Sequence, residues 1–188
     1  MGMNYEENYC NTTLFRNWTK RDAELTFAGK DQANTLAAFL LENQLQIDHI
    51  ISSPFVRAID SIRPYAIQAN LSIEEDERLA ERILSNVPMD DWMQKLESTF
   101  TNIDIAFSGG ESTKQATDRA ISLIQDVLKL NHTTTLLVTH GNLLTLILKH
   151  FDRTIGFSEW RTLTNPDVYE ITIDEQSFIK RLWEASSK

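Results

Sequence analysis

Short apolar segments alternate with amphipathic helical segments along most of this sequence, and this alternation limits the fold more than any other feature. Apolar residues recur at helical spacing from Lys30 to Gln46, and a short apolar run from Ile47 to Ile51 follows. The same order returns later, where an amphipathic helix precedes the β-branched and apolar segment from Thr134 to Thr139. Strands that alternate with long helices form parallel sheets whose two faces are covered. The sequence therefore predicts an α/β fold of three layers, with a mostly parallel sheet and helices on both faces.

Several further segments fit the same fold. They are a helix after Pro54, a strand from Leu71 to Ile73, a short helix from Met89 to Leu96, an amphipathic helix opened by Gly109 to Ser112, a helix from Leu143 to His150, and a strand from Val168 to Ile173. The stretch from Glu74 to Ser108 is more polar and irregular, and we expect it to pass over the edge of the sheet, with residues 82–108 over the pocket. No internal repeat or linker divides the 188 residues, so we expect one domain over residues 1–188.

The composition excludes several classes of partner. The net charge of −9 argues against nucleic acid, whose recognition needs clustered cations. No apolar run approaches the ~20 residues of a membrane span, and the polar start is unlike a signal peptide. The single Cys10 excludes a disulfide within the chain. We therefore expect a cytoplasmic protein without membrane or nucleic-acid partners. Its acidic balance still permits a phosphorylated ligand, provided that a few cations gather in one pocket.

Two polar turns fall where predicted strands end, at the edge where open α/β sheets bind their ligands. The first, from Ser52 to Arg57, places Arg57 one turn into the following helix. The second, from Thr139 to Asn142, places His140 at a strand tip. A guanidinium and an imidazolium at one edge would suit a phosphate group. Taken alone, Arg57 is better explained as a solvated helix residue, whereas His140 is equally consistent with a structural histidine at a strand end.

Five short motifs follow one another between residues 25 and 141. They are Leu25-Thr26-x-x-Gly29-x-x-Gln32-Ala33, Ser52-Ser53-Pro54-x-x-Arg57-Ala58, Leu79-Ala80-Glu81, Gly110-Glu111-Ser112 and Thr139-His140-Gly141. Each motif is weak alone, but the ordered series resembles the histidine phosphatase superfamily, also called the phosphoglycerate mutase-like family. The resemblance extends over about residues 25 to 173.

This resemblance implies a phosphoglycerate mutase-like fold and phosphoryl transfer through a phosphohistidine, with neither a metal nor another cofactor. Arg57 resembles an arginine of the phosphate pocket, and His140 resembles the second histidine, which binds phosphate and takes part in catalysis. Glu81 resembles the general acid that protonates the leaving oxygen. Considered alone, it would be interpreted as a solvated charge in a charge-rich stretch. The implied partner is a small phosphorylated molecule or inorganic phosphate.

One feature of the family is missing. The family begins with an apolar strand that ends in Arg-His-Gly, whose histidine is the nucleophile, whereas this chain has no histidine before His49. Residues 1–24 are therefore atypical, and Thr12 to Phe15 is the nearest candidate for such a strand. His49 starts a predicted strand, His132 precedes another, and His150 ends a helix, so we expect all three outside the pocket.

Three explanations of the missing histidine remain open. The first is that the chain starts late or is altered, and that a strand with the nucleophile belongs upstream. The second is a natural non-catalytic relative that still binds phosphorylated ligands or has a regulatory role. The third is another nucleophile, since Cys10 and Arg16 have the bare spacing of a cysteine-dependent phosphatase loop, although Leu14 and Phe15 are too bulky for such a loop.

We expect the complete form to be a phosphomonoester hydrolase. A hydrolase is favoured over a mutase because the stretch from Arg82 to Ser108 is too short to hold and return a phosphorylated intermediate. Without the nucleophile, this chain should have little or no activity. The alternative is a phosphate-binding or regulatory module.

Overall fold

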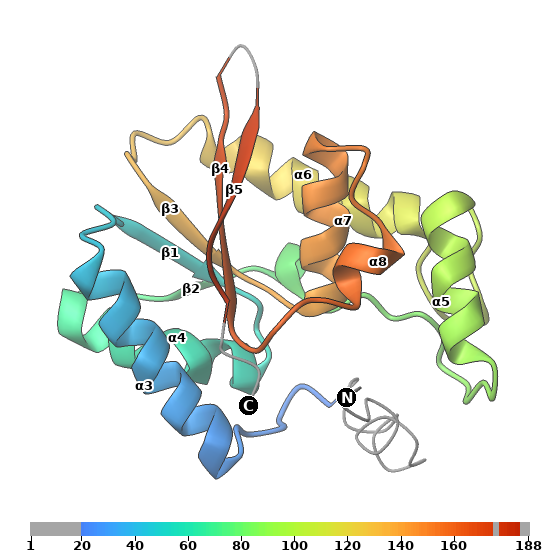
Figure 1. Ribbon diagram of the computed structural model, residues 1–188, viewed down its shortest axis with the longest axis horizontal. Helices are drawn as coiled ribbons and strands as arrows, with labels where there is room; N and C mark the ends of the chain where they lie inside the picture. Colours follow the sequence, from blue (N-terminus) through green and yellow to red (C-terminus); the bar gives the residue numbers. More distant parts are fainter. Residues whose placement is uncertain (1–19, 175–176, 185–188) are drawn as a thin grey trace.

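The computed structural model describes residues 20–174 and 177–184, and the structural statements below concern these residues. Its elements alternate as predicted (Figure 1). The helices are α3 (Phe27–Glu42), α4 (Val56–Ala69), the 3-10 helix η1 (Glu77–Leu79), α5 (Trp92–Thr101), α6 (Thr113–Val127), α7 (Gly141–Phe151) and α8 (Phe157–Trp160). The strands are β1 (His49–Ser52), β2 (Glu74–Glu75), β3 (Thr135–Val138), β4 (Asp167–Thr172) and β5 (Phe178–Glu184).

Three strands form a parallel sheet in the order β2-β1-β3. The register aligns His49 with Thr135 and Ser52 with Val138, so β1 and β3 end side by side at their carboxyl ends. The late strand predicted from Val168 to Ile173 corresponds to β4. It pairs antiparallel with β5, which the sequence reasoning missed.

Two helical layers cover the two faces of the sheet. Figure 1 shows α3 and α4 together on one side and α6 and α7 on the other. Side chains alternate accordingly: Ile50 and Leu136 pack in the α3 and α4 cluster, while Ile51 and Leu137 pack toward α6 and its neighbours. This alternation toward helices on both faces of the sheet confirms the predicted three-layer α/β fold.

Several predicted boundaries were wrong by a few residues. The first helix begins at Phe27, before the predicted Lys30, because the Thr26 side chain caps it by accepting a hydrogen bond from the Gly29 amide. It ends at Glu42, because Gln44 takes a left-handed conformation.

The strand predicted at Leu71 to Ile73 was also misplaced. Leu71 and Ile73 pack against the α3 and α4 cluster, but the residues that pair with β1 are Glu74 and Glu75. The short helix predicted at Met89 to Leu96 is α5, which runs from Trp92 to Thr101.

No helix among the described residues is long and apolar enough to cross a membrane.

Candidate active site

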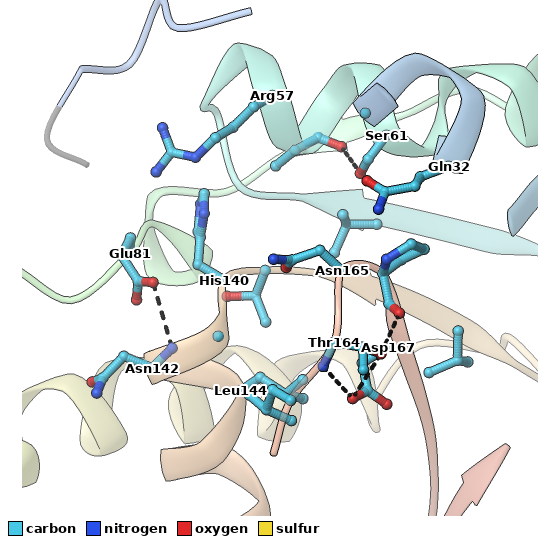
Figure 2. Close-up of a pocket in the computed structure, with 18 of the residues that line it drawn as sticks. Gln32, Arg57, Ser61, Glu81, His140, Asn142, Leu144, Thr164, Asn165 and Asp167 are labelled. Atoms are coloured by element: carbon cyan, nitrogen blue, oxygen red, sulfur yellow. Dashed lines mark hydrogen bonds between the residues drawn. The ribbon is translucent and has the colours of Figure 1, made fainter. Parts of the chain in front are cut away.

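A cavity of about 1010 Å³ opens where the carboxyl ends of β1 and β3 meet the helices that follow them. Arg57, Glu81 and His140, the predicted site residues, all line it. Figure 2 shows their side chains next to one another on one side of the cavity, with Arg57 reaching in from α4. The structure thus brings together three residues that are far apart in the sequence, at the edge of the sheet where α/β proteins bind ligands.

Arg57 lies in the first turn of α4 and is held in place by Phe55. Its guanidinium carbon lies 4.6 Å from the centre of the Phe55 ring, within the range of a cation–π contact. One guanidinium nitrogen also donates to the backbone oxygen of Lys20 at 3.0 Å. Partial burial lowers the pKa of Arg57 from its ordinary value, while the nearby Glu81 carboxylate raises it. The side chain is therefore a positioned cation beside a titratable carboxyl.

His140 stands at the N-terminus of α7, directly after β3. Its Nε2 atom lies 2.7 Å from the Oγ atom of Ser53, and its ring meets the edge of the Phe55 ring at a centroid distance of 4.9 Å. Burial, together with the charges of Arg57 and Arg119, lowers the pKa of His140 to about 3. The ring is therefore neutral at neutral pH. The imidazolium suggested by the sequence was wrong, because desolvation and two nearby cations disfavour the charged form.

Glu81 follows η1 and reaches the start of α7. Its carboxylate accepts hydrogen bonds from the amides of Asn142 and Leu143 at 3.4 and 3.3 Å, and the first of these is drawn in Figure 2. The carboxylate also accepts a hydrogen bond from the backbone amide of Arg82 at 2.8 Å. Burial raises the pKa of Glu81 above its ordinary value, and these amides and Arg57 only partly oppose the shift. A raised pKa is the direction that a proton donor needs.

Arg119 on α6 fixes the segment that carries Glu81. Its guanidinium donates to the backbone oxygens of Arg78 and Ala80 at 2.7 and 2.9 Å. It also pairs with both carboxylate oxygens of Glu111. Glu111 of the Gly110-Glu111-Ser112 motif therefore acts on the site indirectly, because it pairs with the arginine that holds the backbone before Glu81.

Gly110 itself is required by close packing. A Cβ atom at this position would lie 2.2 Å from the backbone oxygen of Leu84. Ser112 then caps α6, with a reciprocal hydrogen bond between its backbone amide and the side chain of Gln115.

The other three histidines lie outside the cavity. The rings of His49 and His132 stack at a centroid distance of 4.3 Å near the amino ends of β1 and β3, at the opposite edge of the sheet. His150 lies in the last turn of α7. Cys10, Arg16 and the stretch from Thr12 to Phe15 lie outside the described residues.

Some residues of the site were not singled out from the sequence. Ser53 and Phe55 belong to the Ser-Ser-Pro-Phe turn, but a turn motif does not reveal which side chain they contact. Trp92 and Met93 of α5 also line the cavity, and they come from the irregular stretch between Arg82 and Ser108. Among the described residues, no group of three or more histidine, cysteine or acidic side chains is arranged to hold a metal ion.

Comparison with known proteins identifies the family. A model of the histidine phosphatase superfamily, branch 1, matches residues 11–186, nearly the whole sequence. The chain belongs to the histidine phosphatase superfamily. The match begins at residue 11, well before the first motif at Leu25, so it includes Thr12 to Phe15.

Solved structures of histidine phosphatases share the fold. A mycobacterial glucosyl-3-phosphoglycerate phosphatase in complex with inorganic phosphate is 21% identical, with a TM-score of 0.70, covering 88% of this chain and 89% of that one. The YhfR protein of Bacillus stearothermophilus is 21% identical, with a TM-score of 0.68 and coverages of 88% and 87%. The α-ribazole phosphatase of Shigella flexneri is 20% identical, with a TM-score of 0.65 and coverages of 86% and 84%. No curated protein matches the sequence.

Proposed function

We propose that this histidine phosphatase homologue binds inorganic phosphate or a small phosphorylated molecule in the cavity and has little or no phosphatase activity. One observation carries the proposal. Arg57, Glu81 and His140 line one cavity, but none of the other three histidines of the sequence lines it. The anion-binding residues of the site are therefore present, whereas a second histidine, which phosphohistidine chemistry of this family requires, is not among the described residues of the cavity.

Arg57 is the main phosphate ligand in this proposal. Its planar guanidinium can donate two parallel hydrogen bonds to phosphate oxygens. His140 is neutral, so it contributes a ring nitrogen rather than a charge, unless the bound dianion draws a proton onto it. The mycobacterial relative whose structure holds inorganic phosphate supports the choice of ligand. The expected partner is therefore inorganic phosphate or a small phosphorylated molecule of the cytoplasm.

Phosphomonoester hydrolysis is the second candidate, and Glu81 favours it. Burial raises the pKa of this carboxyl, as a general acid requires. In such a reaction a nucleophile forms a bond to phosphorus, the ester P–O bond breaks, and the leaving oxygen takes the proton of Glu81. Water then cleaves the phosphoenzyme and releases phosphate. This candidate needs a nucleophile beyond the described residues of the cavity.

Titration calorimetry with inorganic phosphate tests the first proposal. The parent protein should bind phosphate, and Arg57→Ala should weaken binding at least ~10-fold, since hydrogen bonds to charged groups contribute about 1.5–3 kcal/mol. Arg63→Ala is the matched control, because Arg63 lies on the same helix, is exposed, and pairs only with Asp60 among the described residues. Equal affinity in the parent and Arg57→Ala would refute the binding role.

Turnover of p-nitrophenyl phosphate distinguishes the two candidates. The first predicts no hydrolysis above a heat-inactivated control. Hydrolysis by the parent that Glu81→Gln abolishes would instead establish the second candidate, and its persistence in Cys10→Ser would exclude the cysteine as nucleophile.

A further inference from the structure

Two apolar side chains form the wall of the cavity directly beside its phosphate end, the end formed by Arg57 and His140. A Cβ atom on Gly141, the residue after His140, would lie 3.6 Å from the Cδ1 atom of Leu163 and 3.9 Å from the indole Nε1 atom of Trp160. Both side chains line the cavity, and both come from α8 and the turn that follows it. Figure 1 shows α8 beside α7, whose first residue is Gly141.

Trp160 is held in one position by its neighbours. Its indole stacks on the ring of Phe157 at a centroid distance of 5.4 Å and an interplanar angle of 17°. Phe157 in turn packs against Phe100 of α5, with ring centroids 5.9 Å apart. The Glu159 carboxylate fixes the start of α8 by accepting a hydrogen bond from the Gly156 amide at 2.6 Å. A ligand in contact with this indole therefore does not have to order it first.

The nitrogen edge of the Trp160 indole faces Gly141 and has no acceptor within the described part of the chain. The residue is half-buried, and a buried indole N–H usually has a hydrogen-bond partner. Since Phe157 covers one side of the ring, the other side and the N–H edge remain for the cavity. Such a surface fits a ligand with an oxygen at the phosphate end and an apolar group beyond it.

The cavity offers far more room than a phosphate occupies. Its volume of about 1010 Å³ is at the upper limit of small-molecule sites. Further large apolar side chains in its wall are Trp92 and Met93 of α5 and Leu144, which Figure 2 shows on α7 after His140. Polar side chains, among them Gln32 and Asn165, also line the cavity. A hydroxyl-bearing ligand is therefore the alternative that an experiment has to exclude.

We propose that the cavity takes the phosphate ester of an aromatic alcohol and that Trp160 selects its organic group. This inference rests on the proposed function, which places the phosphate at Arg57 and His140. A phosphate bound there has Trp160 and Leu163 at its side, so the attached organic group lies against their apolar surfaces. An aromatic ring gains from leaving water and from packing against the indole. A group rich in hydroxyls would lose hydrogen bonds to water at this wall without replacing them.

Titration calorimetry with phosphonates, whose C–P bond a phosphatase does not cleave, tests this selectivity. Benzylphosphonate and methylphosphonate carry the same charged group and differ by a phenyl ring. Benzylphosphonate should bind the parent at least ~10-fold more tightly than methylphosphonate, because the ring is removed from water. Hydroxypropylphosphonate is the polar analogue, and its advantage over methylphosphonate should stay below ~3-fold.

The variants locate the ring through the ratio of the affinities for benzylphosphonate and methylphosphonate. Trp160→Ala should lower this ratio to below ~3, and Leu163→Ser should lower it in the same direction. Trp160→Phe keeps an aromatic surface, so it should retain a ratio of at least ~5. Phe178→Ala is the control, because it removes an exposed ring outside the cavity and should leave the ratio unchanged.

Binding of methylphosphonate by each variant shows that the phosphate end remains folded. Because Trp160 packs against the core of α5, α6 and α7, Leu163→Ser provides the result if Trp160→Ala does not fold.

The outcomes separate this inference from the phosphate site on which it rests. Equal affinities of benzylphosphonate and methylphosphonate in the parent would overturn the aromatic preference and leave the phosphate site intact. Tighter binding of hydroxypropylphosphonate than of benzylphosphonate would assign the cavity to a hydroxyl-bearing ester. An unchanged ratio in both Trp160→Ala and Leu163→Ser would overturn the role of Trp160. If the parent binds neither phosphonate, the phosphate site itself is refuted, and this inference with it.

Discussion

The Nε2 atom of His140 lies 2.7 Å from the Oγ atom of Ser53, whose side chain is fully buried. The same oxygen accepts a hydrogen bond from the backbone amide of Phe55 at 3.3 Å, so the Ser53 hydroxyl is also held by the turn after β1. This turn therefore positions the imidazole that follows β3. The two strand ends are linked through side chains as well as through the sheet.

Ser53→Ala should destabilise the protein by about 1–3 kcal/mol, because it leaves the partly buried ring nitrogen without its partner. Urea unfolding of the parent and the variant measures this difference. Ser98→Ala is the control. The half-buried Ser98 hydroxyl donates only to the backbone oxygen of Lys95 in the same helix, among the described residues, so its loss should change the stability by less than about 0.5 kcal/mol. Equal losses in both variants would contradict the special role of the Ser53 hydroxyl.

The depressed pKa of His140 predicts that the protein loses stability in mild acid. The folded state holds a ring with a pKa of about 3, while the unfolded chain has an ordinary pKa near 6.5. Between these values the unfolded state binds the proton, so the free energy of unfolding falls as the pH drops from about 6.5 toward 3, by up to about 1.4 kcal/mol per unit. The contribution of His140 is fully present only above pH 6.5.

His140→Gln isolates this contribution from that of the carboxylates. The variant should show a shallower loss of stability between pH 6 and pH 4 than the parent, as measured by urea unfolding at each pH. Glu81 acts in the opposite direction. Because the pKa of Glu81 is raised in the folded state, its protonated form stabilises the fold at pH values below the ordinary pKa of a glutamate. This stabilisation is lost as the pH rises through the raised pKa. Parallel pH curves for the parent and His140→Gln would show that the ring is not desolvated.

Arg119→Lys should destabilise the protein by about 2 kcal/mol, although it keeps the charge. A lysine cannot reproduce the fork that contacts Glu111 and the backbone oxygens of Arg78 and Ala80. Since the same oxygens fix the segment before Glu81, the variant should also shift the pH dependence of phosphate binding. Arg63→Lys, at an exposed ion pair with Asp60, should change the stability by less than about 0.5 kcal/mol. A similar small effect of Arg119→Lys would refute its positioning role.

The sequence predicted those parts of the fold and site that depend on local pattern. The helix α6 was predictable, because Gly110 and Ser112 mark its start and its apolar residues recur at helical spacing. Arg57 and His140 were placed correctly at the strand ends, because short motifs after β1 and β3 carry them. The charge state of His140 was not predictable. It depends on burial and on Arg57 and Arg119, which only the tertiary structure brings near the ring. The position of β2 was also missed, because hydrogen-bond pairing with β1, rather than apolar character, determines which residues form this edge strand.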